Sequence, residues 1–523
     1  MAVVQGRAGS YDTLEGLLYT NYFTGNIGFN LIASNFRSDG YRDNNYNRQS
    51  NVQAEARLVS ERGDVSFKIG NDNQGLRLPG ARTVQPSAGI NQLESDRRGT
   101  STPLDYTQRA GNRVTLDWRQ ETGIGEFNLG LGYRDKEQTS YFDQGGFPDY
   151  RVANLDVWSV SPRMRFPQLL AGLPNTLVAG LDWYRWDYRL RVSNSQANIT
   201  QPINTVDATQ ENSALYVQNT TQLSPRLTLV AGARRERYRI SASDLFDSAA
   251  PGGAFVSGAA PGSQEESESA YELALRYQFA AEWAAIGRLG RSYRFANVDE
   301  IYEFSGPPLF SREFQFLRPQ TAQSYDVGLE RRRENSALRA TLFNIDVTDE
   351  IHLDAFSTGI GNTNLPPSRR RGLELEAQQA LGSALRLTGS YSYTEARFLE
   401  GSLANVMIAG KTVPLVPRHK LNAGASWAVG SRTRLTALVT YVSDQFMDND
   451  EGNTLGVKIP AYTVADLKLA WQEGGWRVSA AVNNLLNEKY YNYAVRSQFV
   501  ADRYNAYPLP ERNFTMTAEY TFR

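Results

Sequence analysis

The chain has 523 residues, with 55 lysines and arginines against 56 aspartates and glutamates, two histidines and no cysteine. No stretch reaches the 18 or more consecutive apolar residues of a membrane-spanning helix, and the missing cysteine excludes disulfides, thiolate metal sites and cysteine nucleophiles. A net charge of −1 gives no electrostatic footprint for nucleic acid, and two histidines leave little for imidazole metal sites, so most metalloenzymes are disfavoured.

The first seven residues lack the basic start, apolar middle and small-residue cleavage site of a secretory signal. The length would suit three or four soluble domains, yet no linker, charge block or shift in composition divides the chain. We therefore expect a single domain over residues 1–523. The lack of a secretory signal has two alternative explanations: the export signal has been removed from the chain, or the chain stays inside the cell.

Short and long connections alternate along the sequence. We expect a first short strand before Ser10-Tyr11 and then tight turns at Thr24-Gly25-Asn26, Glu61-Arg62-Gly63, Thr122-Gly123-Ile124, Pro225, Ala281-Glu282, Asn335, Gly382-Ser383, Gly430-Ser431 and Gly474-Gly475, with a slightly longer link from Pro167 to Pro174. Long polar or aromatic connections lie between them, at roughly 38–50, 74–109, 137–152, 191–210, 242–268, 296–317, 351–368, 399–417, 446–459 and 490–510. The spacing predicts about 22 strands at roughly 24 residues per strand and connection.

The alternation of apolar and polar residues is clearest at the end of the chain. Phe514, Met516, Ala518, Tyr520 and Phe522 fall on one face of a strand, and polar residues fall on the other. Segments at 385–394, 421–427, 466–472 and 476–483 alternate in the same way. These segments are half-apolar strands.

The pattern predicts an all-β fold, a transmembrane antiparallel β-barrel of about 22 strands with short periplasmic turns and long extracellular loops. A soluble protein with so many hairpins would be a propeller or several sandwiches, and the sequence shows neither a blade repeat nor domain breaks. In the barrel, the polar series that includes Glu374, Asp466 and Arg477 lines a wet lumen.

Several motifs, in their order along the chain, resemble those of TonB-dependent outer-membrane receptors. They are Gly9-Ser10-Tyr11-Asp12-Thr13, Tyr293-Arg294-Phe295-Ala296, the run from Phe316-Leu317-Arg318-Pro319 to Gly328-Leu329-Glu330, Arg371-Gly372-Leu373-Glu374-Leu375-Glu376, Val416-Pro417-Arg418-His419-Lys420-Leu421, Asn483-Asn484-Leu485-Leu486-Asn487-Glu488-Lys489-Tyr490-Tyr491, and Tyr507-Pro508-Leu509-Pro510-Glu511-Arg512-Asn513-Phe514. Each motif is weak alone, but their order and spacing cover nearly the whole chain.

The resemblance implies a 22-stranded barrel in the outer membrane of a Gram-negative bacterium. Such receptors bind a scarce nutrient, usually a ferric siderophore and sometimes haem, cobalamin or a glycan, and import it with energy delivered by TonB. The plug domain that should precede the first hairpin is missing, so contact with TonB is expected only through that missing part. We expect a truncated or engineered barrel, with a natural plugless product as the alternative. The chain ends on Arg523 rather than on an aromatic residue, and we expect Tyr520 and Phe522 to serve as the assembly signal.

Two aromatic clusters in the long connections are candidate ligand-binding residues. Tyr302, Phe304, Phe310, Arg312 and Phe314 would suit a flat, anionic ligand such as a ferric catecholate, through stacking and charge-assisted hydrogen bonds. A loop that merely packs its aromatic residues over its neighbours is an equal alternative. Tyr141, Phe147 and Tyr150 form a similar cluster with Phe142.

One of the two histidines and one acidic run are candidate ligands for haem or a metal ion. The family's haem receptors carry a histidine between the Phe295-Ala296 and Leu317-Arg318-Pro319 elements, and this chain has none there. His352 lies where it would reach a ligand, although a lone loop histidine is more often solvated. The run Asp448-Asn449-Asp450-Glu451-Gly452-Asn453 resembles a calcium loop, but it lacks the third acidic ligand and distal glutamate of an EF-hand, so an acidic surface loop is favoured.

The sequence therefore predicts a receptor barrel for a ferric siderophore, with a cobalamin or haem receptor and a large passive porin as alternatives. We expect no enzyme, since there is no G-x-S-x-G elbow and neither histidine pairs in sequence with a serine and an acid. We also expect no cofactor, no resident metal ion and no nucleic-acid partner. The expected partners of this monomer are the siderophore, outer-membrane lipid and lipopolysaccharide, and the barrel-assembly machinery.

Overall fold

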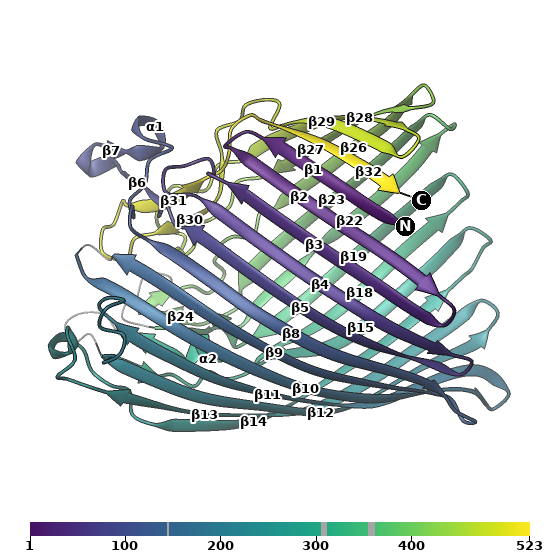
Figure 1. Cartoon of the computed structure of the whole chain (residues 1–523), viewed down its shortest axis with the longest axis horizontal. Coiled ribbons are helices and arrows are strands. Elements are labelled where there is room, and N and C mark those ends of the chain that lie inside the picture. The colour runs from purple at the N-terminus through teal and green to yellow at the C-terminus, as the bar shows by residue number, and fades with distance from the viewer. Residues whose placement is uncertain (144–145, 305–310, 354–360, 523) are drawn as a thin grey trace.

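The computed structural model describes residues 1–143, 146–304, 311–353 and 361–522, and within them one closed sheet of 22 strands forms the body of the molecule (Figure 1). Each strand of this sheet pairs antiparallel with its neighbours along the chain. The last strand, β32, pairs with β1, so that Ala2 lies opposite Phe522 and Gly9 opposite Thr515. Closure leaves no open edge with unpaired backbone groups, which a lipid environment requires. The predicted fold class is confirmed.

We call the strands of this closed sheet the wall. Their bounds are β1 Ala2–Gly9, β2 Thr13–Thr24, β3 Ile27–Ser38, β4 Asn47–Ser60, β5 Gly63–Arg77, β8 Tyr106–Glu121, β9 Glu126–Asp143, β10 Pro148–Leu170, β11 Leu173–Ser193, β12 Asn204–Ser224, β13 Leu227–Phe246, β14 Gly262–Tyr277, β15 Trp283–Arg294, β18 Gln320–Arg332, β19 Ser336–Thr348, β22 Ser368–Leu381, β23 Leu385–Phe398, β26 His419–Val429, β27 Thr433–Val442, β28 Tyr462–Glu473, β29 Trp476–Asn483 and β32 Asn513–Phe522.

The other elements of the described residues are short and lie in the long connections. They are β6 Arg82–Gln85, η1 Pro86–Ala88, β7 Ile90–Asn91, α1 Gln92–Ser95, η2 Gly253–Phe255, α2 Val298–Ile301, β16 Tyr302–Phe304, β17 Arg312–Phe314, β20 Glu350–His352, β21 Thr363–Leu365, β24 Ser402–Leu403, β25 Val406–Met407, β30 Tyr491–Arg496 and β31 Tyr504–Pro508. No helix among the described residues is long and apolar enough to cross a membrane.

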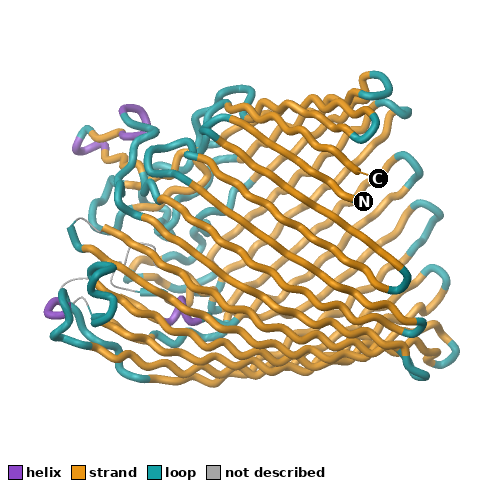
Figure 2. The backbone as a smooth tube through the Cα atoms, viewed as in Figure 1, coloured by secondary structure: helices purple, strands orange, loops and turns teal. Residues whose placement is uncertain are grey.

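The two ends of the barrel differ in their connections. Figure 2 shows short turns at the end that carries both termini and long connections at the other end. All nine predicted tight turns fall between consecutive wall strands. The predicted link from Pro167 to Pro174 is wrong, because β10 continues to Leu170 and only Ala171 and Gly172 form the turn. Pairing of β10 with β9 ends at Arg165, so Pro167 lies on a hairpin edge where a missing backbone N–H is tolerated.

Strands β10 to β13 are 20–23 residues long, about twice what a bilayer requires. The predicted connections at 137–152, 191–210 and 242–268 are therefore too wide, since strands enter them from both sides. The outward face of these strands is apolar at Leu181 and Leu215 and becomes charged further along, where Glu265 pairs with Arg239 at 2.7 Å. Above the lipid the strands carry charged residues on the outward face and apolar residues such as Val192 and Ile240 on the inner face. This reverses the alternation of a lipid-facing strand, so the sequence indicates a loop there.

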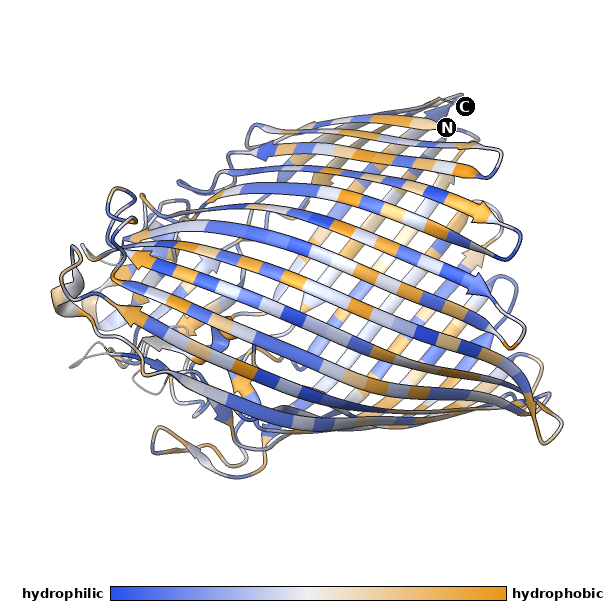
Figure 3. Cartoon of the chain, turned by 60° about the horizontal axis from the view of Figure 1, so that its bottom comes forward, coloured by the Kyte–Doolittle hydropathy of each residue, from blue (hydrophilic) through white to orange (hydrophobic). Residues whose placement is uncertain are grey.

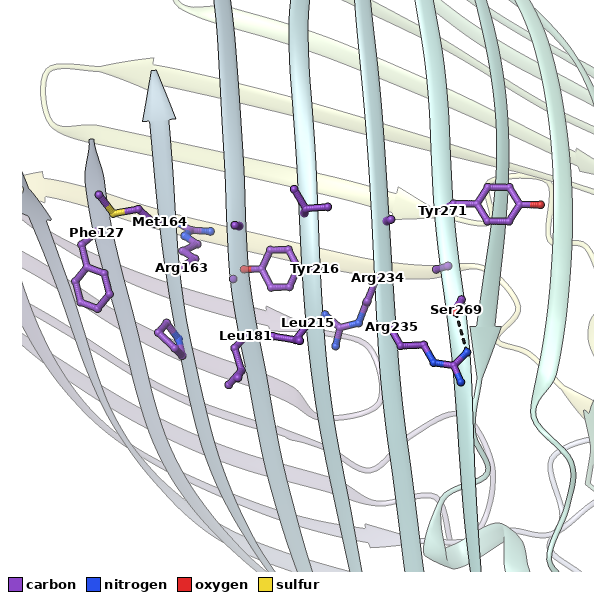
Figure 4. Close-up of a pocket in the computed structure, with 16 residues that line it drawn as sticks. Phe127, Arg163, Met164, Leu181, Leu215, Tyr216, Arg234, Arg235, Ser269 and Tyr271 are labelled. Atoms are coloured by element: carbon purple, nitrogen blue, oxygen red, sulfur yellow. Dashed lines mark hydrogen bonds between the residues drawn. The ribbon is translucent and has the colours of Figure 1, made fainter. Parts of the chain in front are cut away.

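Apolar side chains on the outward face form the surface that meets lipid. Val65, Phe67 and Ile69 of β5 are exposed on this face, and Figure 3 shows hydrophobic and hydrophilic positions alternating along the strands. A shallow apolar hollow on the same face crosses from β9 to β14 (Figure 4), with Leu181, Leu215 and Tyr271 among its lining residues. Such a hollow suits lipid chains rather than a polar ligand.

The inward face carries ionic ladders instead. Asp64 accepts hydrogen bonds from Arg57 at 2.7 Å and from Arg119 at 2.6 Å, and Arg234 bridges Asp182 and Glu236. These charges line the predicted wet lumen.

The buried apolar clusters of the described residues gather at the end with long connections. One of them forms what we call the cap: the four-stranded sheet β7-β6-β31-β30 and the side chains of residues 443–461 packed against it. Met447 and Ile459 are completely buried there, beside Ala494 and Ala506. The cap joins distant parts of the chain, since the Thr83 hydroxyl donates to Asn505 Oδ1 over a sequence separation of 422.

Candidate functional site

The candidate ligand-binding residues of the connection after β15 are placed by a short turn of helix. Asn297 caps α2: its side chain accepts hydrogen bonds from the backbone N–H groups of Asp299 and Glu300, and the Glu300 carboxylate accepts the N–H of Asn297. Arg294 forms an ion pair with Glu300. This turn directs the chain into β16, so Tyr302 starts a hairpin rather than continuing the wall strand.

We call β16 and β17 the mouth hairpin. Tyr302 lies opposite Phe314 in its register, and their rings stand 5.3 Å apart. Both rings pack on an apolar cluster of the inner wall formed by Leu190, Val192 and Val206. The Tyr302 hydroxyl donates to Asp244 Oδ2 at 3.1 Å. The hairpin therefore lies against the inner face of β11 to β13.

Positive charge accompanies the aromatic rings of the mouth hairpin. The Arg312 guanidinium lies 5.4 Å from the centre of the Tyr302 ring, within the range of a cation–π contact. Burial lowers the pKa of Arg312, and the nearby Arg151 lowers it further. Burial raises the pKa of Tyr302, so its phenol is a neutral donor at physiological pH. A partly desolvated guanidinium beside aromatic rings suits a flat anion.

The structure brings only some of the predicted residues together. Tyr302, Arg312 and Phe314 meet in the mouth hairpin. The backbone of Phe304 pairs with Arg312, but the Phe304 side chain and all of Phe310 lie outside the described residues.

The second predicted cluster is not a loop. Tyr141 and Tyr150 are register partners on β9 and β10; Tyr150 is buried, and Tyr141 stacks on Tyr106 with ring centres 6.0 Å apart. Phe147 lies in the short connection and is 75% exposed. The prediction of a long aromatic loop is wrong here, because the wall continues to Asp143 and resumes at Pro148.

His352 and the acidic run are neighbours in space, which the sequence did not reveal. His352 ends β20, and its Nε2 lies 3.9 Å from Glu451 Oε1. The prediction of an acidic surface loop is wrong, since Asn449, Asp450 and Glu451 are buried. The loop is part of the cap, where the Asp448 backbone forms a β-bridge with Val495 and Asp450 pairs with Arg496 at 2.8 Å.

Sequence reasoning missed the inner-wall residues that support the mouth hairpin. Tyr188 packs on both neighbouring apolar clusters, and Tyr238, almost completely buried, donates to the Ala296 carbonyl at 2.9 Å. Both residues lie just before the predicted connections at 191–210 and 242–268, in segments that the sequence indicates only as ordinary wall. The inward alternation of β11 and β13 is the signal that identifies them.

The proposed assembly signal lies at the other end of the barrel. Tyr520 contacts Trp476 with ring centres 4.8 Å apart, and Phe522 is half exposed on the outward face. Its role in assembly stays a prediction.

Comparison with known proteins agrees with this architecture. Residues 35–485 match the family model described as TonB dependent receptor-like, beta-barrel. The ferrichrome outer membrane transporter/phage receptor of Escherichia coli (strain K12) is 26% identical over 254 residues, which are 45% of this chain and 32% of that protein. An uncharacterized TonB-dependent receptor of Haemophilus influenzae is 26% identical over 214 residues, which are 39% of this chain and 54% of that protein.

The chain thus matches about a third and about half of the lengths of these two curated relatives. Among solved structures, the ferric yersiniabactin uptake receptor FyuA from Yersinia pestis has a TM-score of 0.81 at 16% identity, covering 100% of this chain and 80% of that one. This likeness confirms the fold, and the family match covers most of the chain. The chain therefore belongs to the TonB-dependent receptor β-barrel family, whose place is the outer membrane of Gram-negative bacteria.

Proposed function

We propose that this barrel captures a ferric siderophore at its extracellular mouth, and that the intact protein imports it with energy delivered through TonB. The observation that carries the proposal is the mouth hairpin, which places Tyr302, Arg312 and Phe314 together on the inner wall of a receptor-family barrel. In this proposal residues 1–523 are one barrel domain that acts as a receptor and performs no catalysis.

The chemistry of the mouth hairpin fits such a ligand. A ferric siderophore presents chelating oxygens with negative charge and, in the catecholate class, aromatic rings. Arg312 supplies charge-assisted hydrogen bonds, and the aromatic rings supply flat contact area. The named relatives support the same class, since one is called a ferrichrome transporter and one solved structure a ferric yersiniabactin receptor. Their identity to this chain is low, so the particular siderophore is left to experiment.

Binding to the refolded, detergent-solubilised chain tests the proposal. Quenching of the eight tryptophans would be titrated with ferrichrome, a ferric catecholate and ferric citrate, with cobalamin and haem as competing ligand classes. We expect saturable quenching by one ferric complex. Arg312→Gln and Phe314→Ala should each weaken it roughly 10- to 100-fold, as for residues at the centre of a binding site.

The matched controls are Arg332→Gln and Phe499→Ala. Arg332 and Phe499 are 75% and 68% exposed, and neither belongs to the mouth hairpin. Equal loss of binding in these controls would contradict the assignment. Saturable binding of cobalamin or haem alone would replace the ligand class, and conductance without saturable binding of any ligand would favour a passive porin.

A further inference from the structure

Three potential metal ligands from two separate connections meet near the cap. His352 belongs to the connection between β19 and β22, whereas Asp448 and Glu451 belong to the connection between β27 and β28. One nitrogen of His352 and one carboxylate oxygen from each acid lie within 4.8 Å of one another. An imidazole with two carboxylates is a common ligand set for divalent transition metals.

Glu451 is buried beside this cluster, and its own backbone N–H donates a hydrogen bond to its carboxylate. It is 7% exposed, and among the described residues no side chain donates a hydrogen bond to its carboxylate. His352 Nε2 lies 3.9 Å from Glu451 Oε1, which is too far for a hydrogen bond. A buried carboxylate is costly unless a cation or hydrogen bonds compensate its charge.

Asp448 is held in place by β30 of the cap. Asp448 Oδ2 accepts a hydrogen bond from the Tyr493 hydroxyl at 2.6 Å, and the Asp448 backbone pairs with Ala494 and Arg496 of β30. Asp450 points to a different set of partners, since its Oδ1 accepts from Arg496, Thr454 and Leu455. Hydrogen bonds that orient a ligating carboxylate are typical of metal sites.

We propose that His352, Asp448 and Glu451 bind one divalent transition-metal ion such as Zn²⁺, with water completing the coordination. An ion placed between three atoms that lie no more than 4.8 Å apart would be at most about 2.8 Å from each, so inward movements of up to roughly 0.7 Å give the distances of zinc–ligand bonds. The imidazole disfavours Ca²⁺ and Mg²⁺, which prefer oxygen ligands. The ion joins the connection after β19 to the connection after β27 and so fixes one side of the barrel mouth.

The experiment uses the two histidines of the chain as a matched pair. Chelator-treated chain in detergent is titrated with Zn²⁺ by calorimetry and with Co²⁺ by visible absorbance. The variants are His352→Ala, Glu451→Gln and the control His419→Ala. His419 lies on β26, where its Nδ1 and the Tyr391 hydroxyl form a 2.9 Å hydrogen bond. Migration on gels before and after heating verifies that each variant forms a folded barrel.

We expect one equivalent of Zn²⁺ and a tetrahedral Co²⁺ spectrum in the parent chain and in His419→Ala. His352→Ala and Glu451→Gln should each weaken Zn²⁺ binding at least 10-fold and remove the Co²⁺ spectrum. Zn²⁺ should also slow amide hydrogen exchange at 350–352 and 448–451. Absence of one-to-one binding, unchanged binding in His352→Ala, or equal loss in His419→Ala would overturn the site. Preference for Ca²⁺ over Zn²⁺ would overturn the proposed class of ion.

Discussion

The wall and the cap of this protein are stabilised in opposite ways. In the wall, each strand pairs with the next wall strand along the chain. Apolar residues of the wall point outward, and Val327, for example, is 66% exposed. In the cap, β6 and β31 come from distant segments, and residues such as Met447 are completely buried. The wall is complete only with lipid as its outer layer, whereas the cap has an apolar core of its own, as a soluble domain does.

This difference separates the functions of the two regions. The wall supplies a rigid frame with a charged lumen, and its repetitive hairpins carry little information about a ligand. The long connections, by contrast, bring residues from different parts of the chain to one place, as in the mouth hairpin and in the cluster of His352 with Asp448 and Glu451. Binding sites on connections held by a rigid scaffold are common in proteins.

The largest expected effect concerns the core of the cap. Met447→Ala removes a completely buried side chain and should destabilise the cap by about 2–5 kcal/mol, because a cavity remains. Amide hydrogen exchange of 443–461 and 491–508 measures this opening. Met407→Ala is the control, since Met407 is 66% exposed. If the two regions are independent, the denaturant midpoint of the wall stays unchanged, and an equal fall in both regions would refute the comparison.

A charge on the outward face tests the wall. Val327→Arg should destabilise the barrel by about 2–4 kcal/mol, because a guanidinium near the bilayer midplane is poorly solvated. The matched control is Thr341→Arg on the neighbouring strand, where the lumen-facing register places Glu374 opposite. Denaturant unfolding in lipid vesicles, followed by tryptophan fluorescence, measures both variants. An equal loss in both would mean that the outward face does not meet lipid.

A third, smaller effect concerns Arg42, whose hydrogen bonds join the connection after β3 to the connection after β5. Arg42 is 6% exposed and donates to the carbonyls of Pro79, Gly80 and Gly99. Burial lowers the pKa of Arg42 to about 10, so the side chain stays charged at neutral pH. Arg42→Lys cannot reach all three carbonyls and should loosen residues 78–105 by about 1–3 kcal/mol, measured by hydrogen exchange. Arg62→Lys, in an exposed turn of the wall, should leave the same amides unaffected.

The smallest effect is a pH dependence at the rim of the cap. Hydrogen bonds from the Ser87 backbone N–H and hydroxyl lower the pKa of Asp502 below its ordinary 3.8. A lowered pKa means that the contribution to stability is present above pH 3.8 and is lost as the pH falls through the folded value. Exchange at Ser87 should therefore be slower in the parent than in Asp502→Asn at pH 6, and the two should converge in acid. A difference that persists in acid would assign the effect to the side chain's shape rather than its charge.

Much of the wall could be predicted because its rules are local. Gly25, Gly430 and Gly474 mark turns where the backbone takes positive φ, and the alternation in β32 identifies its outward face. Predictions of the wall failed where strands continue beyond the lipid. Tyr141 and Tyr150 belong to a hairpin that extends above the lipid, where the outward face no longer has to be apolar and the alternation of a lipid-facing strand is not maintained.

The candidate sites were predictable only as separate pieces. The aromatic residues around Tyr302 and the arginine at 312 stand close in sequence, but their support by Tyr188 and Tyr238 follows from the curvature of the closed wall. His352 and the run from Asp448 to Glu451 lie in different connections, and nothing in the order of residues indicates that they meet.

The sequence by itself determined the closed β-barrel and, for the strands with clear alternation such as β32, the side that faces lipid, because hairpin pairing and alternation are properties of neighbouring residues. Only the tertiary structure decided the cap, the seating of the mouth hairpin and the meeting of His352 with Glu451. These contacts join residues that are far apart in the chain, and they arise because apolar and charged groups of the long connections must find partners above the membrane.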